Sequence, residues 1–264
     1  MAGPQVTPAT NEPLLLAQLA KRVGVLPSDL LVAGDQQAAL RRFLVARKYD
    51  LDAAEAQLKS TLAWRAQFGV SALLASPPRK RLALVRALLP ANPLLGFTHN
   101  HVPVSLISLG GANTAVAARE LTANDVVVDF VVRAEFYRAV VFPEASARAG
   151  VLVDKEVAVL DMGGKSLSLA KVLPLFKAVN AVGSAFFPER TLNILVVNAP
   201  LTFSALWALV RCHGPGSFAL GHVTHRHSQL QGFVDPRTQR KISVLSGGDK
   251  QLQGTPLRNL LGHG

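Results

Sequence analysis

The hydrophobic positions between Val157 and Pro200 predict a strand, a helix and a second strand. Val157–Met162 is a short apolar run, and Thr191–Val197 is another that is rich in β-branched residues. Runs of this length without strict polar alternation are typical of strands covered on both faces. From Leu167 to about Val182 apolar residues recur at helical spacing, although Pro174 should kink this helix or mark its true start. The pattern predicts a βαβ unit with parallel strands and a right-handed crossover.

A second long apolar segment, Thr122 to Phe142, is ambiguous by propensity. Five of the seven residues 126–132 are valines, which favours a strand. The sequence Thr122-Ala123-Asn124-Asp125 fits a capping box, and Asp129 precedes Arg133 by four residues, which favours a helix. The segment is too long for one ordinary strand. We therefore predict a helix that ends at Phe142-Pro143.

Three amphipathic helices are predicted near the N-terminus. Glu12–Val23 carries leucines on one face, and Asp35–Lys48 has Asp35 as its cap. Leu51–Phe68 has Asp50 as its cap and Gly69 just beyond its end. Only two residues separate the last two helices, so we expect an antiparallel hairpin. Further along, we predict a basic helix over 79–89 and a strand that ends at Ser108.

Composition and charge point to anionic and apolar partners. Of the 264 residues, 49% are hydrophobic and only 6% aromatic, which suits a core of Leu, Val and Ala and also suits an apolar cavity. The formal net charge is +11, which favours a membrane surface, a phospholipid headgroup or nucleic acid as partner. The sequence contains no nucleic-acid-binding motif, so membrane and lipid are the preferred interpretation.

The same totals bear on the compartment. The single Cys212 excludes an internal disulfide and suits a reducing environment. The first residues lack the basic and apolar regions of a secretory signal. No stretch of about 18 residues is apolar enough for a spanning helix. We expect a cytoplasmic protein that meets membranes from the water side.

Catalytic and metal-binding motifs are incomplete. Gly164–Ser168 follows a strand but lacks the second glycine of a nucleophile elbow. Gly163–Ser166 resembles the end of a phosphate-binding loop without its upstream glycine. The spacing of the residues in the His-rich segment fits no standard zinc module. These residues are Cys212, His213, His222, His225 and His227. We expect a protein that is not an enzyme and that has no metal and no cofactor, with bound phospholipid as its ligand.

Three separate segments carry a family resemblance. Phe187-Pro188-Glu189-Arg190, followed eight residues later by Asn198-Ala199-Pro200, resembles the (Y/F)PER…NAP signature of CRAL-TRIO lipid-binding domains. Leu40–Asp50, LRRFLVARKYD, and the Trp64-Arg65 that follows resemble the helical domain that precedes such domains. Farther on, Asp235–Leu245, DPRTQRKISVL, is similar to the family's DPxTxxKIxxL. The family includes phosphatidylinositol transfer proteins of the secretory pathway and carriers of tocopherol and retinaldehyde.

The resemblance implies a domain organisation. We expect residues 1–11 to be disordered, 12–75 to form a small all-α domain, and 76–264 to form the CRAL-TRIO domain. The implied fold class is α/β, with a mostly parallel sheet floor and helices that close over an apolar pocket. Residues 211–232 are rich in Gly, His and Ser and are predicted to be a disordered insertion.

The resemblance also implies a headgroup site. In phosphatidylinositol-binding members, the groups around the inositol phosphate match Arg47, Lys48, Glu189, Thr238 and Lys241 of this chain. Compact positive charges suit a phosphate, and a carboxylate accepts hydrogen bonds from sugar hydroxyls. The alternative is that the two basic residues only end a helix and that Glu189 pairs with Arg190.

A second ligand of the family, phosphatidylcholine, is matched less well. Ser166 and Ser168 fit the small hydroxyls that follow the VLD strand. The family's tyrosines are replaced by Ser105 and Val140, and Tyr137 lies one turn away, so a choline ammonium loses its aromatic partners.

The resulting hypothesis is binding and intermembrane transfer of a phospholipid, phosphatidylinositol first, by a monomer. Three alternatives remain open: a carrier of another hydrophobic ligand such as a tocopherol, retinoid or sterol, an interaction module that has lost lipid exchange, and an esterase-like enzyme.

Overall fold

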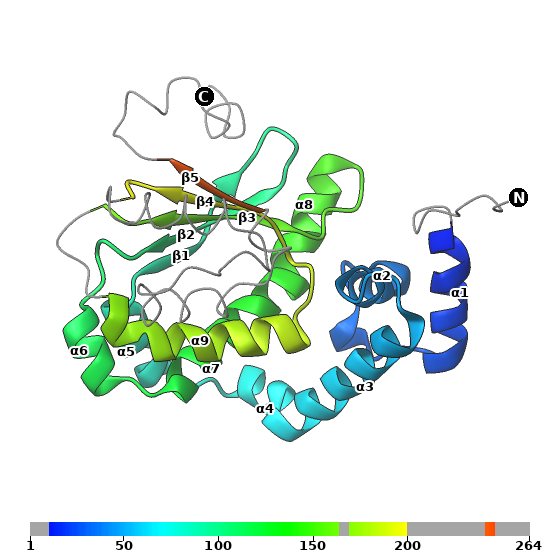
Figure 1. The fold of residues 1–264 in the computed structure, drawn as a ribbon, viewed down its shortest axis with the longest axis horizontal. Coiled ribbons are helices and arrows are strands. Elements are labelled where there is room, and N and C mark those ends of the chain that lie inside the picture. Colours follow the sequence, from blue (N-terminus) through cyan, green and yellow to red (C-terminus); the bar gives the residue numbers. More distant parts are fainter. Residues whose placement is uncertain (1–10, 164–168, 200–240, 246–264) are drawn as a thin grey trace, which may run out of the picture.

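The computed structural model describes residues 11–163, 169–199 and 241–245. Helices α1, α2 and α3 form a separate group beside the sheet, while α5, α6, α7 and α9 form a layer on one side of it (Figure 1). This arrangement confirms the predicted α/β fold class with N-terminal helices.

The N-terminal helices form as their local sequence predicts. They are α1 (Glu12–Val23), α2 (Gln36–Ala46) and α3 (Leu51–Phe68), with a 3-10 turn η2 (Ser28–Leu30) between the first two. The Asp35 carboxylate accepts hydrogen bonds from two backbone N–H groups of α2, and the Asp50 carboxylate accepts one from α3. Gly69 ends α3 in the left-handed region, with φ 72°. Their apolar faces bury Leu19, Leu40 and Leu58 in one core that also includes Phe142 from the other half of the chain.

The sheet has five strands in the order β1-β2-β3-β4-β5. These strands are β1 (Ala91–Phe97), β2 (Pro103–Ser108), β3 (Glu156–Asp161), β4 (Thr191–Val197) and β5 (Ile242–Leu245). Strands β2 to β5 are parallel, and β1 pairs antiparallel with β2 at one edge. The predicted parallel βαβ unit is confirmed, and apolar residues lie on both faces of its strands. One face carries Val157, Val159 and Leu195, and the other carries Val196 and Ile194 against Phe176 of α9.

Helix α4 (Val70–Ala75) follows α3, and the helical layer contains α5 (Arg79–Leu88), α6 (Thr114–Glu120), α7 (Ala123–Phe136) and α9 (Leu169–Phe186). Thr122 and Asp125 form the predicted capping box at the start of α7. Asp129 lies buried in α7 and pairs with Arg133 one turn on and with Arg86 of α5. Within the described residues, no helix is long and apolar enough to cross a bilayer.

One prediction about proline is wrong, and one of the two alternatives for a second proline is excluded. The helix that begins with α7 does not end at Phe142-Pro143, because it continues through a π-helical turn η3 (Tyr137–Val141) into α8 (Phe142–Ala149). The wider turn accommodates the missing N–H and the ring of Pro143, which a regular α-helix does not. Pro174 does not mark the start of α9, which begins at Leu169 and continues to Phe186.

Buried charge pairs join the N-terminal helices to the rest of the molecule. Arg65 of α3 donates to the Glu135 carboxylate of α7 at 2.5 Å, and Arg138 approaches the same carboxylate at 2.8 Å. Glu135 is 2% exposed, so its charge depends on these two guanidinium groups.

We predict that Glu135→Gln lowers the free energy of unfolding by about 3 kcal/mol, because it leaves buried guanidinium groups without full compensation. Urea-induced unfolding measures the change. The matched control is Glu144→Gln, which removes an exposed carboxylate paired with Arg148 and should cost less than about 1 kcal/mol. Equal effects of the two changes would contradict this role of the buried pair.

Candidate functional site

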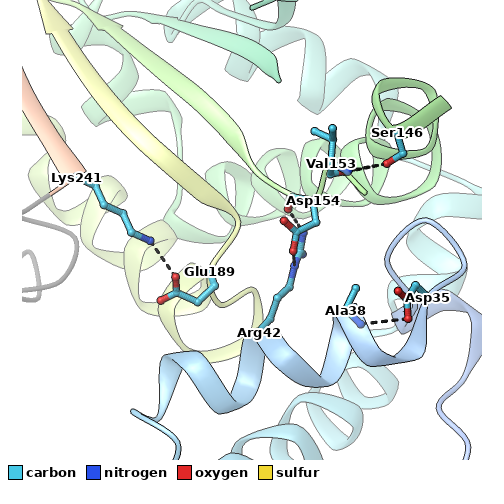
Figure 2. Close-up of polar contacts among 8 residues, drawn as sticks. All are labelled: Asp35, Ala38, Arg42, Ser146, Val153, Asp154, Glu189 and Lys241. Carbon is cyan, nitrogen blue, oxygen red and sulfur yellow. Dashed lines mark hydrogen bonds and ion pairs between the residues drawn. The ribbon is translucent and has the colours of Figure 1, made fainter. Parts of the chain in front are cut away.

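The candidate site lies at the edge of the sheet where three parallel strands begin. Because β3, β4 and β5 run in the same direction, the residues just before each strand meet at one edge. Those residues include Asp154, Glu189 and Lys241. Helix α2 crosses this edge, and its Arg42 points toward Asp154 (Figure 2).

Two of the predicted headgroup residues are in contact. Lys241 Nζ lies 3.1 Å from Glu189 Oε2, and the two side chains are 22% and 10% exposed (Figure 2). Glu189 has φ 54°, in the left-handed region that non-glycine residues rarely adopt. Backbone strain of this kind costs about 1–3 kcal/mol and persists only where the surroundings enforce it. The alternative pairing of Glu189 with Arg190 is not observed, since Arg190 contacts Glu156 at 3.3 Å instead.

The other two described headgroup residues lie in the turn after α2. Arg47 ends the helix, and Lys48 and Tyr49 follow with φ 55° and 67°. Backbone hydrogen bonds from Tyr49 N to Leu44 O at 2.8 Å and from Asp50 N to Arg47 O at 3.0 Å close the turn. Arg47 and Lys48 are both exposed.

A single side chain connects Arg47 to the segment that carries Glu189. Arg47 Nε donates to Gln57 Oε1 at 2.8 Å. Gln57 Nε2 donates to the carbonyl oxygens of Ser184 at 3.1 Å and Ala185 at 2.9 Å, near the end of α9. The structure thus joins Arg47 to the end of α9 and, separately, brings Glu189 and Lys241 into contact. Thr238, Ser166 and Ser168 lie outside the described residues and stay predictions.

A pocket lined by several arginines was not predicted from the sequence. It lies between α2, α3, α7, η3 and residues 186–190, and its interior offers about 40 Å³ to the centres of water-sized molecules, several times the roughly 10–15 Å³ that one water needs. Its charged lining consists of Arg42, Arg65, Glu135, Arg138 and Arg190.

Two of these arginines are incompletely compensated. Burial lowers the pKa of Arg42 to about 10, which Asp154 partly offsets and Arg190 reinforces. Arg190 lies with its guanidinium carbon 5.8 Å from the ring centre of Tyr137, and its buried Nε has no partner among the residues that the structure describes. One signal for Arg42 existed in the sequence: Ala38 and Ala39, on its face of α2, leave room for a neighbouring element.

The phosphatidylcholine contacts of the family find little support in the described residues. The Tyr137 hydroxyl donates to the Pro93 carbonyl, and the side chain is only 2% exposed. Burial raises the pKa of this phenol well above its usual range. Ser105 is also buried, and Val140, although exposed, has no aromatic face for a choline ammonium.

The NAP segment has a structural role at the opposite end of the sheet. Asn198 Nδ2 donates to Asp161 Oδ1 at 2.9 Å, and Gly163 N donates to the same oxygen at 2.8 Å. Gly110 lies so close that a Cβ there would fall 1.3 Å from the Gly163 carbonyl oxygen, so this position requires glycine. These contacts join the carboxyl ends of β2, β3 and β4.

No metal site is found in residues 11–163, 169–199 and 241–245, where no group of three or more His, Cys, Asp or Glu side chains is suitably placed. The histidines of 211–232, and the predicted insertion itself, lie outside these ranges.

Part of the chain matches a known protein family. A family profile described as the CRAL/TRIO domain matches residues 91–215. This part of the chain is similar to CRAL-TRIO domains. The match begins at β1 and includes the turn that carries Glu189. The division into domains at residue 75 stays a prediction.

Three similar proteins illustrate the range of sequence identity and coverage. A CRAL-TRIO domain-containing protein of Saccharomyces cerevisiae is 26% identical over 84% of this chain and 68% of its own length. The SEC14 cytosolic factor of Kluyveromyces lactis is 28% identical with the same coverage. The phosphatidylinositol/phosphatidylcholine transfer protein SFH12 of Arabidopsis thaliana is 26% identical over 80% of this chain and 35% of its own length.

The fold is also similar to a solved structure. The crystal structure of Sfh5 superposes with a TM-score of 0.60 at 15% identity, covering 96% of this chain and 85% of that one. At this identity the similarity concerns the fold.

We predict that Asp154→Ala loosens the contact between α2 and the sheet edge. The Arg42 guanidinium then keeps only the backbone carbonyl of residue 154 as its acceptor there, at a cost of about 2 kcal/mol for the lost charged hydrogen bond. Hydrogen exchange followed by mass spectrometry should show faster exchange in α1, α2 and α3. The control Asp52→Ala removes an exposed carboxylate bonded to Arg22 and should leave exchange unchanged. Unchanged exchange in the Asp154 variant would refute this anchoring role.

Proposed function

We propose that the protein binds a phospholipid, with phosphatidylinositol as the first candidate, and transfers it between membranes without making or breaking a bond. The observation that carries the proposal is the Glu189–Lys241 contact at the sheet edge, and the exposed basic residues Arg47 and Lys48 at the end of α2 are proposed to complete the site. The names of the relatives, which include phosphatidylinositol/phosphatidylcholine transfer proteins, support the same class of ligand.

The chemistry of these groups suits an inositol phosphate. Arg47, Lys48 and Lys241 supply N–H donors and positive charge for a phosphodiester. Glu189 orients the Lys241 ammonium and is an acceptor for ring hydroxyls. Thr238, two residues after Pro236 in the DPxT motif, adds a hydroxyl in this proposal.

The apolar part of the ligand supplies most of the driving force. Burial of each CH₂ group contributes about 0.8 kcal/mol, so two acyl chains outweigh the headgroup contacts. Headgroup contacts therefore decide which lipid is held. The net charge of +11 favours transient contact with anionic membrane surfaces, and we propose a cytoplasmic, peripherally bound monomer.

Phosphatidylinositol is preferred over phosphatidylcholine for a specific reason. The Tyr137 side chain is 2% exposed, and the Arg190 guanidinium already lies 5.8 Å from its ring centre, so this tyrosine offers no open aromatic face to a choline group.

The test is capture of phosphatidylinositol from phosphatidylcholine vesicles that contain it, with bound lipids measured by mass spectrometry. We expect the purified protein to take up phosphatidylinositol. Lys241→Ala and Glu189→Ala should each lower the captured amount about tenfold, the loss expected for one charged hydrogen bond. The control Lys171→Ala, at an exposed position on α9, should change nothing.

Three other results would redirect the interpretation. A different apolar ligand that is insensitive to these changes would indicate a carrier of another hydrophobe. Folded protein that holds no lipid in any variant would indicate an interaction module. Labelling by a serine-directed probe would restore the esterase alternative.

A further inference from the structure

Gln57 is a buried polar residue in the middle of α3, and its side chain faces two elements of the headgroup region. It is 6% exposed, although glutamine usually lies at the surface. Every polar function of its amide has a partner: Oε1 accepts from Arg47, and Nε2 donates twice to α9. Its backbone carbonyl accepts from the Thr61 hydroxyl at 2.9 Å. The side chain is therefore fixed in one orientation.

The two contacts with α9 are made where that helix ends. Ser184 and Ala185 belong to the last turn before Phe186, and carbonyl oxygens of a last turn have no partner within their own helix. Gln57 Nε2 satisfies both. The strained Glu189 follows three residues after Phe186, so Gln57 also fixes the start of the segment that carries this carboxylate.

Gln57 contacts only one of the three guanidinium nitrogens of Arg47. Arg47 Nε donates to Gln57 Oε1 at 2.8 Å. Among the residues that the structure describes, neither terminal nitrogen of Arg47 has a hydrogen-bond partner, and the side chain is exposed. Two adjacent N–H donors in a planar guanidinium match two oxygens of one phosphate group.

Gln57, the partner of Arg47, is neutral and therefore does not cancel the positive charge of Arg47. A carboxylate at position 57 would hold Arg47 equally well but would cancel its positive charge and repel the carbonyl oxygens of α9. An amide fixes the guanidinium and leaves the charge available. The negative end of the α9 dipole, directly behind the amide, adds a favourable field for Arg47.

We infer that Gln57 is a positioning residue of the phosphate-binding site, which sets the Arg47 guanidinium at a fixed distance from the Glu189–Lys241 pair. The inference rests on the proposed binding of a phosphatidylinositol headgroup. Gln57 touches no lipid and acts through Arg47 and through the end of α9.

The experiment is a double-mutant cycle on captured phosphatidylinositol, measured with full-length protein and vesicles of phosphatidylcholine and phosphatidylinositol. Gln57→Met keeps the shape of the side chain and removes its hydrogen bonds. We expect it to lower capture about tenfold, as for one displaced charged contact. In an Arg47→Ala background the same change should add less than about a twofold loss, because residues that act through each other are not additive.

A matched control separates positioning from stability. Gln36 in α2 bridges two segments in the same way, since its Oε1 accepts from Leu26 N at 2.9 Å and its Nε2 donates to Gly24 O at 3.2 Å, but it does not contact Arg47. Gln36→Met should lower the melting temperature comparably and leave phosphatidylinositol capture unchanged. A further variant, Gln57→Glu, should capture less phosphatidylinositol than the parent, because its carboxylate cancels the positive charge of Arg47.

The outcomes are distinguishable. If Lys241→Ala lowers capture and Gln57→Met does not, the inference is overturned and the proposed function stands. Equal losses from Gln57→Met with and without Arg47 would also overturn it, since Gln57 would then act independently of Arg47. If the parent captures no phosphatidylinositol, the proposed function itself fails.

Discussion

The docking of a helical hairpin onto the starting edge of a parallel sheet is the constraint on which the rest of the structure depends. Two buried arginines of the hairpin hold it in place: Arg42 pairs with Asp154 at the sheet edge, and Arg65 pairs with Glu135 of α7. Charge pairs of this kind cost desolvation energy and tolerate little misalignment. The hairpin therefore has one orientation in which its arginines are compensated, and in that orientation the Arg47–Lys48 turn lies beside the segment before β4.

Three of the non-glycine residues with positive φ belong to these segments: Lys48, Tyr49 and Glu189. Each is held by neighbours. Lys48 N donates to Val45 O at 3.1 Å, the Tyr49 hydroxyl donates to Glu12 at 2.7 Å, and Glu189 pairs with Lys241. A site whose groups are already in their bound positions loses less entropy when a ligand arrives.

The sequence predicted what is local and missed what is distant. The caps of α2, α3 and α7 depend on residues within three positions, and all three were predicted. Strand β1 was not, because Pro93 and Gly96 disfavour strand and only pairing with β2 compensates for them. Arg42 and Asp154 are 112 positions apart, and Arg65 and Glu135 are 70 apart, so no spacing rule connects them. Glu189 and Lys241 were linked only through the family motif. Thr238 stays a prediction because it lies outside the described residues.

The π-helical turn at Tyr137–Val141 has a consequence for how this chain is compared with others. Such a turn takes up one residue more than an α-helical turn over nearly the same rise, so side chains beyond it are rotated by roughly 100° relative to a regular helix. Against a protein whose helix is regular at this point, a gapless alignment across Pro143 therefore equates side chains that point to different walls.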